Sequence, residues 1–152
     1  MKLGSRLLVL LACALVNVSA QGGAASQSPT IGNWKVRAAA PAHGTRQYED
    51  RGGGVVVSTR QGVSADGRPY FSQYAAKYDG KEYPRAVKGS ATANTIAFEI
   101  VDADTLKFTL RADGKIISRG TTHVTKDRKV LTVTTWPEGS PESRSEEVYD
   151  RQ

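Results

Sequence analysis

The side chains that most often carry chemistry are few in this chain and widely separated. His43 and His123 are the only histidines, and no carboxylate or cysteine lies near either one at the spacing of metal ligands. A zinc site takes three or four such ligands, so we predict no metal site. A single histidine can ligate haem, which makes His123 a candidate, but a lone histidine in a strand pattern is more often a surface residue. We therefore predict no cofactor.

The short motifs of common enzyme sites are also missing. No Gly-x-Ser-x-Gly nucleophile elbow occurs, and Arg51-Gly52-Gly53-Gly54 lacks the lysine and the following helix of a phosphate-binding loop. The carboxylate pairs Glu49-Asp50 and Asp102/Asp104 fit turn residues. The sequence therefore predicts a protein that is not an enzyme and has no catalytic residues.

Aromatic side chains indicate binding instead. Tyr70, Phe71, Tyr74, Tyr78 and Tyr83 are grouped in one short stretch. Because side chains alternate along a strand, Tyr70, Tyr74 and Tyr78 share one strand face. A tyrosine ring is apolar and its hydroxyl polar, which suits a ligand cavity. The alternative is that these rings are simply the core and edge of a half-exposed sheet.

The elements that must position these side chains are β-strands. From Ile31 onward the apolar residues follow a period of two, and Asp-Gly, the strongest short hairpin signal, occurs at 66–67, 79–80 and 113–114. Residues 37–50 contain Pro41 and Gly44, so we expect at most a turn or two of helix there. Strands are predicted near 32–38, 53–61, 69–78, 81–88, 94–101, 105–112, 115–124, 129–136 and 144–151.

The clearest strand pair is 94–101 with 105–112. In each segment apolar residues such as Phe98 and Phe108 alternate with polar ones, as in a sheet with one wet face. Sequential hairpins favour an all-β fold, an antiparallel up-and-down β-barrel of about 8–10 strands. A barrel of about eight strands encloses side chains or one small ligand.

The N-terminus has the layout of a secretory signal peptide. Lys2 and Arg6 precede a short apolar run, and small residues lead to Ala20, after which we expect cleavage. The run is too short for a transmembrane anchor, so we predict an exported protein, periplasmic or secreted. Cys13, the only cysteine, lies inside this segment, and the apolar residues continue past it, unlike a lipoprotein signal. Residues 21–30 are predicted as a flexible leader and 31–152 as one barrel domain.

The charge pattern argues against nucleic acid as a partner. The formal net charge is +6, but basic and acidic residues alternate, and Asp127 interrupts the densest basic cluster, Lys126 to Lys129. A nucleic-acid binder gathers its basic groups into a patch or stripe. The sequence leaves the oligomeric state open.

Two short motifs resemble those of the calycin superfamily, the lipocalins and fatty-acid-binding proteins. Gly32-Asn33-Trp34 resembles the Gly-x-Trp that begins their first strand, and Val148-Tyr149-Asp150-Arg151 resembles a Val-Tyr-Glu-Lys ending. Stretches 76–84 and 129–135 resemble uncharacterised exported bacterial proteins of lipocalin-like fold. The resemblance implies that Trp34 plugs the closed end of a barrel beneath a basic side chain, here Arg144 or Arg151.

The same resemblance implies a site for a ligand carboxylate, held by an inner arginine and by an Arg-x-Tyr on the last strand. Here the last strand has Glu147-Val148-Tyr149, so the tyrosine matches and the arginine does not. Arg119 falls where the inner arginine would lie. A two-residue turn at Asp113-Gly114 directs it inward beside Phe108, with Glu147 as its partner. A three-residue loop with a Gly114 bulge leaves Arg119 and His123 in solvent.

These residues support two hypotheses. The first is a non-enzymatic barrel that binds a small apolar or amphipathic ligand inside. The second is a protein-interaction module, such as an exported inhibitor, that uses its outer face or loops. A cavity lined by Phe98, Phe108 and Tyr149 favours the first, and a filled core favours the second. The candidate ligand-binding residues are Arg119, Tyr149, Glu147, Phe108, Phe98 and Tyr74.

Overall fold

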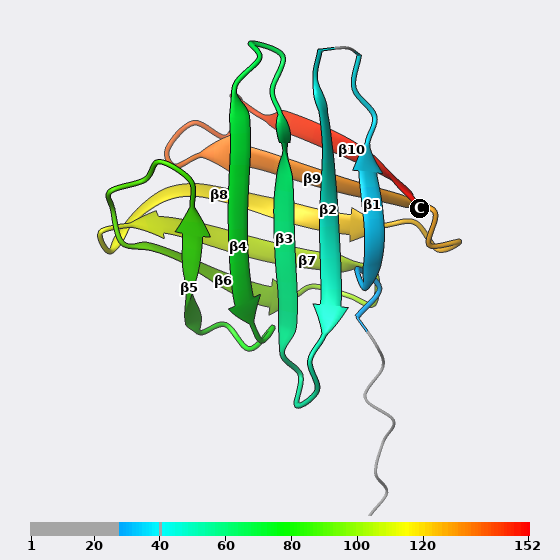
Figure 1. Ribbon diagram of the computed structural model, residues 1–152. Coiled ribbons are helices and arrows are strands. Elements are labelled where there is room, and N and C mark those ends of the chain that lie inside the picture. Colours follow the sequence, from blue (N-terminus) through cyan, green and yellow to red (C-terminus); the bar gives the residue numbers. More distant parts are fainter. Residues whose placement is uncertain (1–27, 40) are drawn as a thin grey trace, which may run out of the picture.

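A computed structural model describes residues 28–39 and 41–152, and in this part of the chain all regular structure is β. Ten antiparallel strands close into one barrel, in which each strand pairs with its sequence neighbours and β1 pairs with β10 (Figure 1). The strands are β1 (Gly32–Val36), β2 (His43–Asp50), β3 (Val56–Val63), β4 (Pro69–Ala76), β5 (Glu82–Val87), β6 (Asn94–Ile100), β7 (Thr105–Ala112), β8 (Lys115–Val124), β9 (Val130–Pro137) and β10 (Ser145–Arg151). The predicted up-and-down barrel is confirmed. The predicted signal peptide, 1–20, lies outside the described residues.

The strand that the sequence pattern missed is β2. Residues 37–50 were expected to hold only a turn or two of helix, because of Pro41 and Gly44. In the structure the proline lies in the loop before β2, where it interrupts no strand pairing. Gly44 lies inside β2, and a Cβ atom there would overlap the hydroxyl of Tyr70. The glycine therefore makes room for an aromatic ring and does not break the strand.

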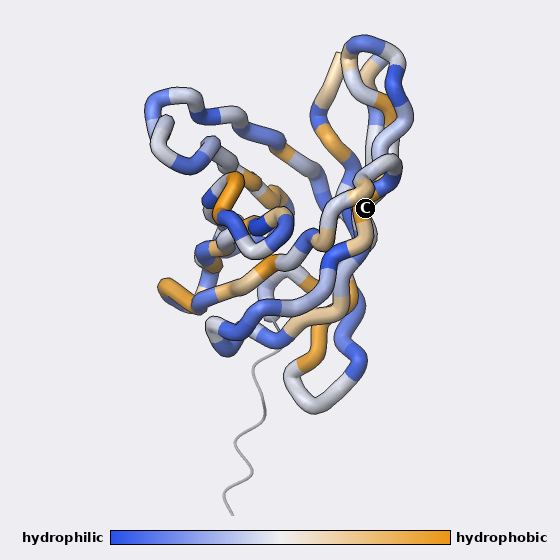
Figure 2. The backbone as a smooth tube through the Cα atoms, turned by 90° about the vertical axis from the view of Figure 1, so that its left-hand side faces the viewer, coloured by the Kyte–Doolittle hydropathy of each residue, from blue (hydrophilic) through white to orange (hydrophobic). Residues whose placement is uncertain are grey.

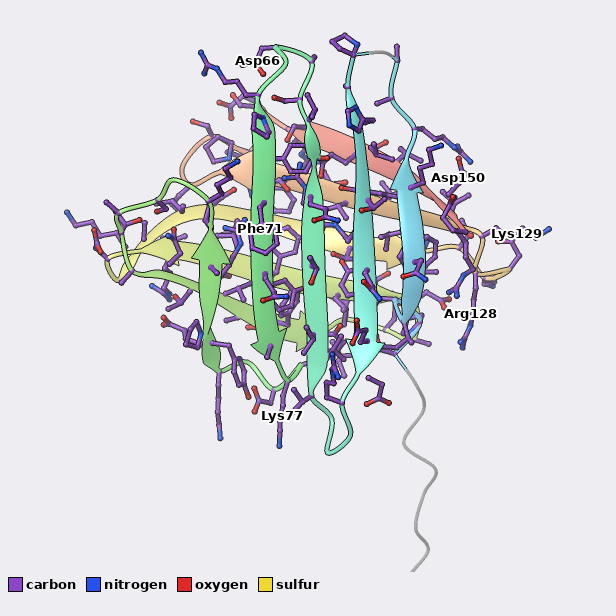
Figure 3. The ribbon with its side chains drawn as sticks, in the orientation of Figure 1. Asp66, Phe71, Lys77, Arg128, Lys129 and Asp150 are labelled. Atoms are coloured by element: carbon purple, nitrogen blue, oxygen red, sulfur yellow. The ribbon has the colours of Figure 1, made fainter. Side chains whose placement is uncertain are left out.

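The strands form two layers that cross. β1 to β4 run side by side in front, and β7 to β10 pass behind them at a steep angle (Figure 1). Hydrophilic and hydrophobic residues alternate along most strands, without a long apolar stretch (Figure 2). Asp66, in the β3–β4 turn, and Lys77, just after β4, mark opposite ends of the barrel (Figure 3). We call the end near Asp66 the mouth.

The opposite end is closed by Trp34, which is fully buried. Its indole Nε1 donates a hydrogen bond of 2.8 Å to the carbonyl oxygen of Thr30. The Arg151 guanidinium carbon lies 4.5 Å from the centre of the indole ring, which confirms the predicted basic stack. Arg144, the other candidate, lies over Trp136 instead. Thr30 is only 1% exposed, so the last residues of the predicted flexible leader belong to the barrel.

The β7–β8 hairpin decides which way Arg119 points. Asp113 and Gly114 have φ angles of 48° and 76°, as in the predicted two-residue type I′ turn. A bulge between Leu110 and Arg111 then shifts the register, so that Phe108 pairs with Gly120. The predicted Phe108–Arg119 pair is therefore wrong: the turn has the expected form, but the bulge directs Arg119 outward.

Candidate functional site

A cavity of about 310 Å³ lies inside the barrel, between the two crossing layers. This volume falls at the lower end of the roughly 300–1,000 Å³ that is typical of small-molecule sites. The hydrophobic part of its lining comes from strands β6, β7 and β9. We call these apolar residues, Ile96, Phe98, Phe108, Leu110 and Val133, the apolar wall; Thr122, Thr135 and Ser145 also line the cavity.

Another part of the cavity is charged. Three arginines and one glutamate, each from a different strand, project into it, and we call this set the charged wall. Its members are Arg46 of β2, Arg60 of β3, Arg85 of β5 and Glu147 of β10. Ser58 of β3 and Ser72 and Tyr74 of β4, which carry hydroxyl groups, also line the cavity. Three guanidinium groups thus face one carboxylate, which leaves an excess of two positive charges.

Strand pairing brings these charges together. Arg46 and Arg60 are direct partners across β2 and β3, and side chains of such partners share one face of the sheet. Arg85 pairs with Tyr74 across β4 and β5, and Tyr74 pairs with Ser58 of β3. The three arginines therefore point into the same part of the interior because the alternation of neighbouring strands is in phase.

Glu147 holds the centre of the charged wall. Arg60 donates both Nη2 and Nε to its two carboxylate oxygens, the second at 3.2 Å. The hydroxyl of Tyr149 donates to Oε2 at 2.8 Å, and Arg46 Nη2 lies 3.6 Å from the same oxygen. Burial acts to raise the pKa of Glu147, but the Arg60 hydrogen bonds and the two positive charges outweigh it and hold the pKa below its ordinary value. Glu147 is therefore ionised at neutral pH.

Arg46 is the most enclosed of the three arginines, with a side chain only 12% exposed. Its Nη1 donates to the Tyr48 hydroxyl at 3.2 Å, and its guanidinium lies 5.3 Å from the centre of the Tyr149 ring. Among the described residues its Nε is buried and finds no hydrogen-bond acceptor. Buried donors normally have partners, and the described protein groups supply none for this one.

Arg85 has no carboxylate partner among the ion pairs of the described residues. Burial lowers its pKa, and the like charges of Arg46 and Arg60 lower it further. A guanidinium stays protonated at neutral pH even so. Arg85 therefore contributes a positive charge that the protein itself does not neutralise.

The sequence-predicted residues separate into two groups. Phe98, Phe108, Tyr74 and Glu147 line the cavity, whereas Tyr149 is fully buried beneath it and bonds to Glu147.

Arg119 lies outside the barrel. Its side chain is 43% exposed and forms an ion pair with Glu138, with Nε 2.7 Å from Oε2. His123 is also exposed on the outer face and contacts Thr105. Of the two placements that the sequence left open, the one with Arg119 inside the barrel beside Glu147 is therefore wrong, and the one with Arg119 and His123 in solvent is confirmed. Arg60, from β3, forms the ion pair with Glu147 that was expected of Arg119.

Sequence reasoning missed all three arginines of the charged wall. Arg46 lies in the strand that was not predicted, and Arg60 and Arg85 lie in predicted strands to which no inward face was assigned. A signal did exist: Arg46 is separated by one residue from both Gly44 and Tyr48, so a strand pattern would have put it on the face of a buried ring.

Two other features, a metal-binding cluster and a membrane-spanning helix, are absent from the described residues. These residues contain no cluster of three or more potential metal-binding side chains drawn from His, Cys, Asp and Glu. They also contain no helix with the length and apolar character needed to cross a membrane.

Comparison with known proteins gives the fold alone. No family model and no curated protein matches the chain. Among solved structures, a redesigned β-barrel, mFAP1, bound to DFHBI is 15% identical with a TM-score of 0.47, and the match covers 82% of this chain and 95% of that one. A de novo designed fluorescence-activating β-barrel is also 15% identical, with a TM-score of 0.43 and coverage of 80% and 93%. At this distance neither similarity bears on what the chain binds.

Proposed function

We propose that this protein binds a small amphipathic anion inside its barrel. The observation that carries the proposal is the cavity, whose two sides differ in character: the apolar wall faces the charged wall across about 310 Å³. An apolar tail would lie against Phe98 and Phe108, and an anionic group against the arginines. A filled core would have favoured the alternative of an outer-face interaction module.

Simple energetics support this assignment. Burying apolar surface contributes about 25 cal/mol per Å², so even a short tail against the apolar wall gives useful affinity. A buried charge without a partner is unfavourable, and the charged wall contains more positive than negative groups. An anionic ligand would neutralise that excess, whereas a cation would add to it.

The proposal includes the biological setting that the sequence indicates. The chain is a lipocalin-like, non-enzymatic binding protein, exported after cleavage near Ala20. The signal-like layout of residues 1–20 and the calycin-like motifs at Trp34 and Tyr149 support this part of the proposal.

Titration with the anionic fluorophore anilinonaphthalene sulfonate tests the proposed site. The purified protein should bind one fluorophore per chain, with enhanced emission and with competition by octanoate. Leu110→Trp places a bulky indole ring in the cavity. It should weaken binding by about tenfold or more, equivalent to at least 1.4 kcal/mol. Thermal unfolding and circular dichroism confirm that the variant is folded.

Arg119→Met is the matched control, because it removes an arginine from the outer face. Its affinity for the fluorophore should equal that of the wild type. Equal binding by a folded Leu110→Trp variant, or no saturable binding by the wild type, would show that the interior is not the binding site.

A further inference from the structure

The geometry points to a phosphate monoester as the head group of the ligand, with Arg85 as the residue that selects its second negative charge. This inference rests on the proposed function, since it names the ligand class of the same cavity. It follows from three features of the cavity: two guanidinium groups without a close carboxylate partner, their convergence, and the hydroxyl-bearing residues beside them.

The internal carboxylate is already fully used. Glu147 accepts hydrogen bonds from Arg60 and from Tyr149, so it neutralises one guanidinium and orients it. Arg46 has only a longer contact to the same oxygen, 3.6 Å, and its Nε finds no acceptor among the described residues. Arg85 forms no ion pair at all within that part of the chain. The positive charges of Arg46 and Arg85 are therefore available to an anionic ligand.

The guanidinium groups of the charged wall lie close enough to repel one another. Burial, and then the like charges of Arg46 and Arg60, lower the pKa of Arg85, and Arg46 and Arg60 are themselves direct cross-strand partners, a position in which like charges are unfavourable. A ligand with one negative charge relieves part of this repulsion and leaves one guanidinium unneutralised. A ligand with two negative charges on one head group balances the whole wall.

The shape of the donor set distinguishes among dianions. The three arginines, from β2, β3 and β5, and the hydroxyl-bearing residues Ser58, Ser72 and Tyr74, from β3 and β4, all line the cavity from consecutive neighbouring strands. A phosphate monoester gathers its two charges and three acceptor oxygens on one atom, which suits converging donors. A dicarboxylate with separated groups would have to place one of them away from the arginines, near the apolar wall or the hydroxyl-bearing residues Thr122 and Thr135, where no positive charge compensates the buried carboxylate.

Matched ligands with one tail and different heads test the inference. Octyl phosphate, octyl sulfate, octanoate and octanol each compete with bound anilinonaphthalene sulfonate. At about pH 7.5 octyl phosphate is mostly a dianion, because its second pKa is about 6, as for other phosphate monoesters. Octyl sulfate is a tetrahedral monoanion throughout. We expect octyl phosphate to bind about tenfold or more tightly than octyl sulfate, a difference of at least 1.4 kcal/mol.

The advantage of the phosphate should shrink between about pH 7.5 and pH 5, as the ligand takes up its second proton. The ionisable groups of the cavity do not titrate in this interval. Arginines stay charged. Burial acts to raise the pKa of Glu147, but Arg60 and Arg46 hold it below its ordinary value, and burial raises the pKa of Tyr74. Binding of octyl sulfate should accordingly stay constant over the same range, which makes it an internal control.

Arg85→Met tests the selecting residue. The phosphate-to-sulfate preference should fall to about twofold or less, because both anions lose the attraction of Arg85 and the doubly charged phosphate loses more of it. Arg119→Met should keep the full preference. If Arg85→Met does not fold, the pH dependence of the wild type still decides the matter.

The outcomes separate the two proposals. Equal affinity for octyl phosphate, octyl sulfate and octanoate, or a preference that is independent of pH, would overturn the phosphate inference and leave the amphipathic-anion site intact. Binding of octanol as tight as that of the anions would likewise remove any role for the charged wall. Failure of all four to compete would overturn the proposed function itself.

Discussion

Trp34 illustrates how a single side chain fixes one end of the barrel. The indole is completely buried, its Nε1 bonds to the Thr30 carbonyl, and Arg151 covers the ring. The same arginine fills the space beside Gly32, where a Cβ would lie 2.6 Å from its Nη1. Gly32 also has a φ of 137°, which residues with a side chain rarely adopt, so the backbone and the stacked guanidinium both favour a glycine at the start of the Gly-x-Trp motif in this chain.

Replacement of Trp34 by alanine should be strongly destabilising. We expect Trp34→Ala to lower the free energy of unfolding by about 3–5 kcal/mol, the usual cost of a large-to-small change in a core. Urea denaturation followed by circular dichroism measures it. Trp136→Ala is the matched control, because this tryptophan is only half-buried and lies near Arg144. A loss below about 1 kcal/mol for Trp34 would contradict its role as a plug.

At the scale of the element, a bulge in the β7–β8 hairpin affects the shape of the cavity. The bulge after Leu110 places Gly120, and not Arg119, directly opposite Phe108. A Cβ at Gly120 would overlap the Phe108 ring and the Thr134 carbonyl oxygen. The ring therefore lies over the glycine, and the space above it stays open to the cavity.

Gly120→Ala should consequently destabilise the barrel and change its interior. Overpacking of this kind costs about 1–3 kcal/mol, and a displaced Phe108 would reduce the fluorophore affinity of the cavity. Denaturation and fluorophore titration measure the two effects. Phe108→Leu in the Gly120→Ala background should recover part of the stability, because the nearest clashing group is then smaller. A neutral Gly120→Ala variant would mean that the ring does not rest on this glycine.

Local signals in the sequence predicted this hairpin only in part. Asp113-Gly114 specified the turn, because both residues adopt positive φ angles. The bulge left no comparable signal, since Ile116 and Ile117 are adjacent and satisfy either face of the strand. One extra residue in β8 then reversed the direction of Arg119. Which residues face the interior is thus a property of the paired strands, and a single strand's alternation does not determine it.

At the scale of the whole molecule, the barrel separates stability from binding. The closed end holds the fully buried side chains, including Trp34, Leu131 and Tyr149. Nearer the middle, the charged wall places repelling groups in a half-buried space, which opposes folding. The sequence predicted an internal cluster of Arg119, Glu147 and Tyr149; Glu147 and Tyr149 do bond to each other, but the arginine beside them is Arg60. The identity of the arginine depended on strand β2 and on the closure of β10 beside β1, neither of which local patterns reveal.

The charged wall also predicts how the stability of the barrel depends on pH. Burial acts to raise the folded-state pKa of Glu147, but Arg60 and Arg46 outweigh it, so the pKa lies below its ordinary value of 4.5. A lowered pKa means that the ionised carboxylate stabilises the fold above about pH 4.5. That contribution is lost as the pH falls through the folded-state value. Glu147→Gln removes the negative charge at every pH and leaves three arginines facing one another.

We therefore expect Glu147→Gln to lower the free energy of unfolding at pH 7 by about 1–3 kcal/mol. This lies between the ~3–5 kcal/mol of a fully buried pair and the small value of an exposed one, because the Glu147 side chain is 34% exposed. The difference from the wild type should decrease below pH 4.5 and vanish once the wild-type carboxylate is protonated. Urea denaturation across this range measures it, with Glu138→Gln, which breaks the exposed Arg119 pair, as the control. A constant difference at all pH values would show that Glu147 acts through its shape and hydrogen bonds, and not through its charge.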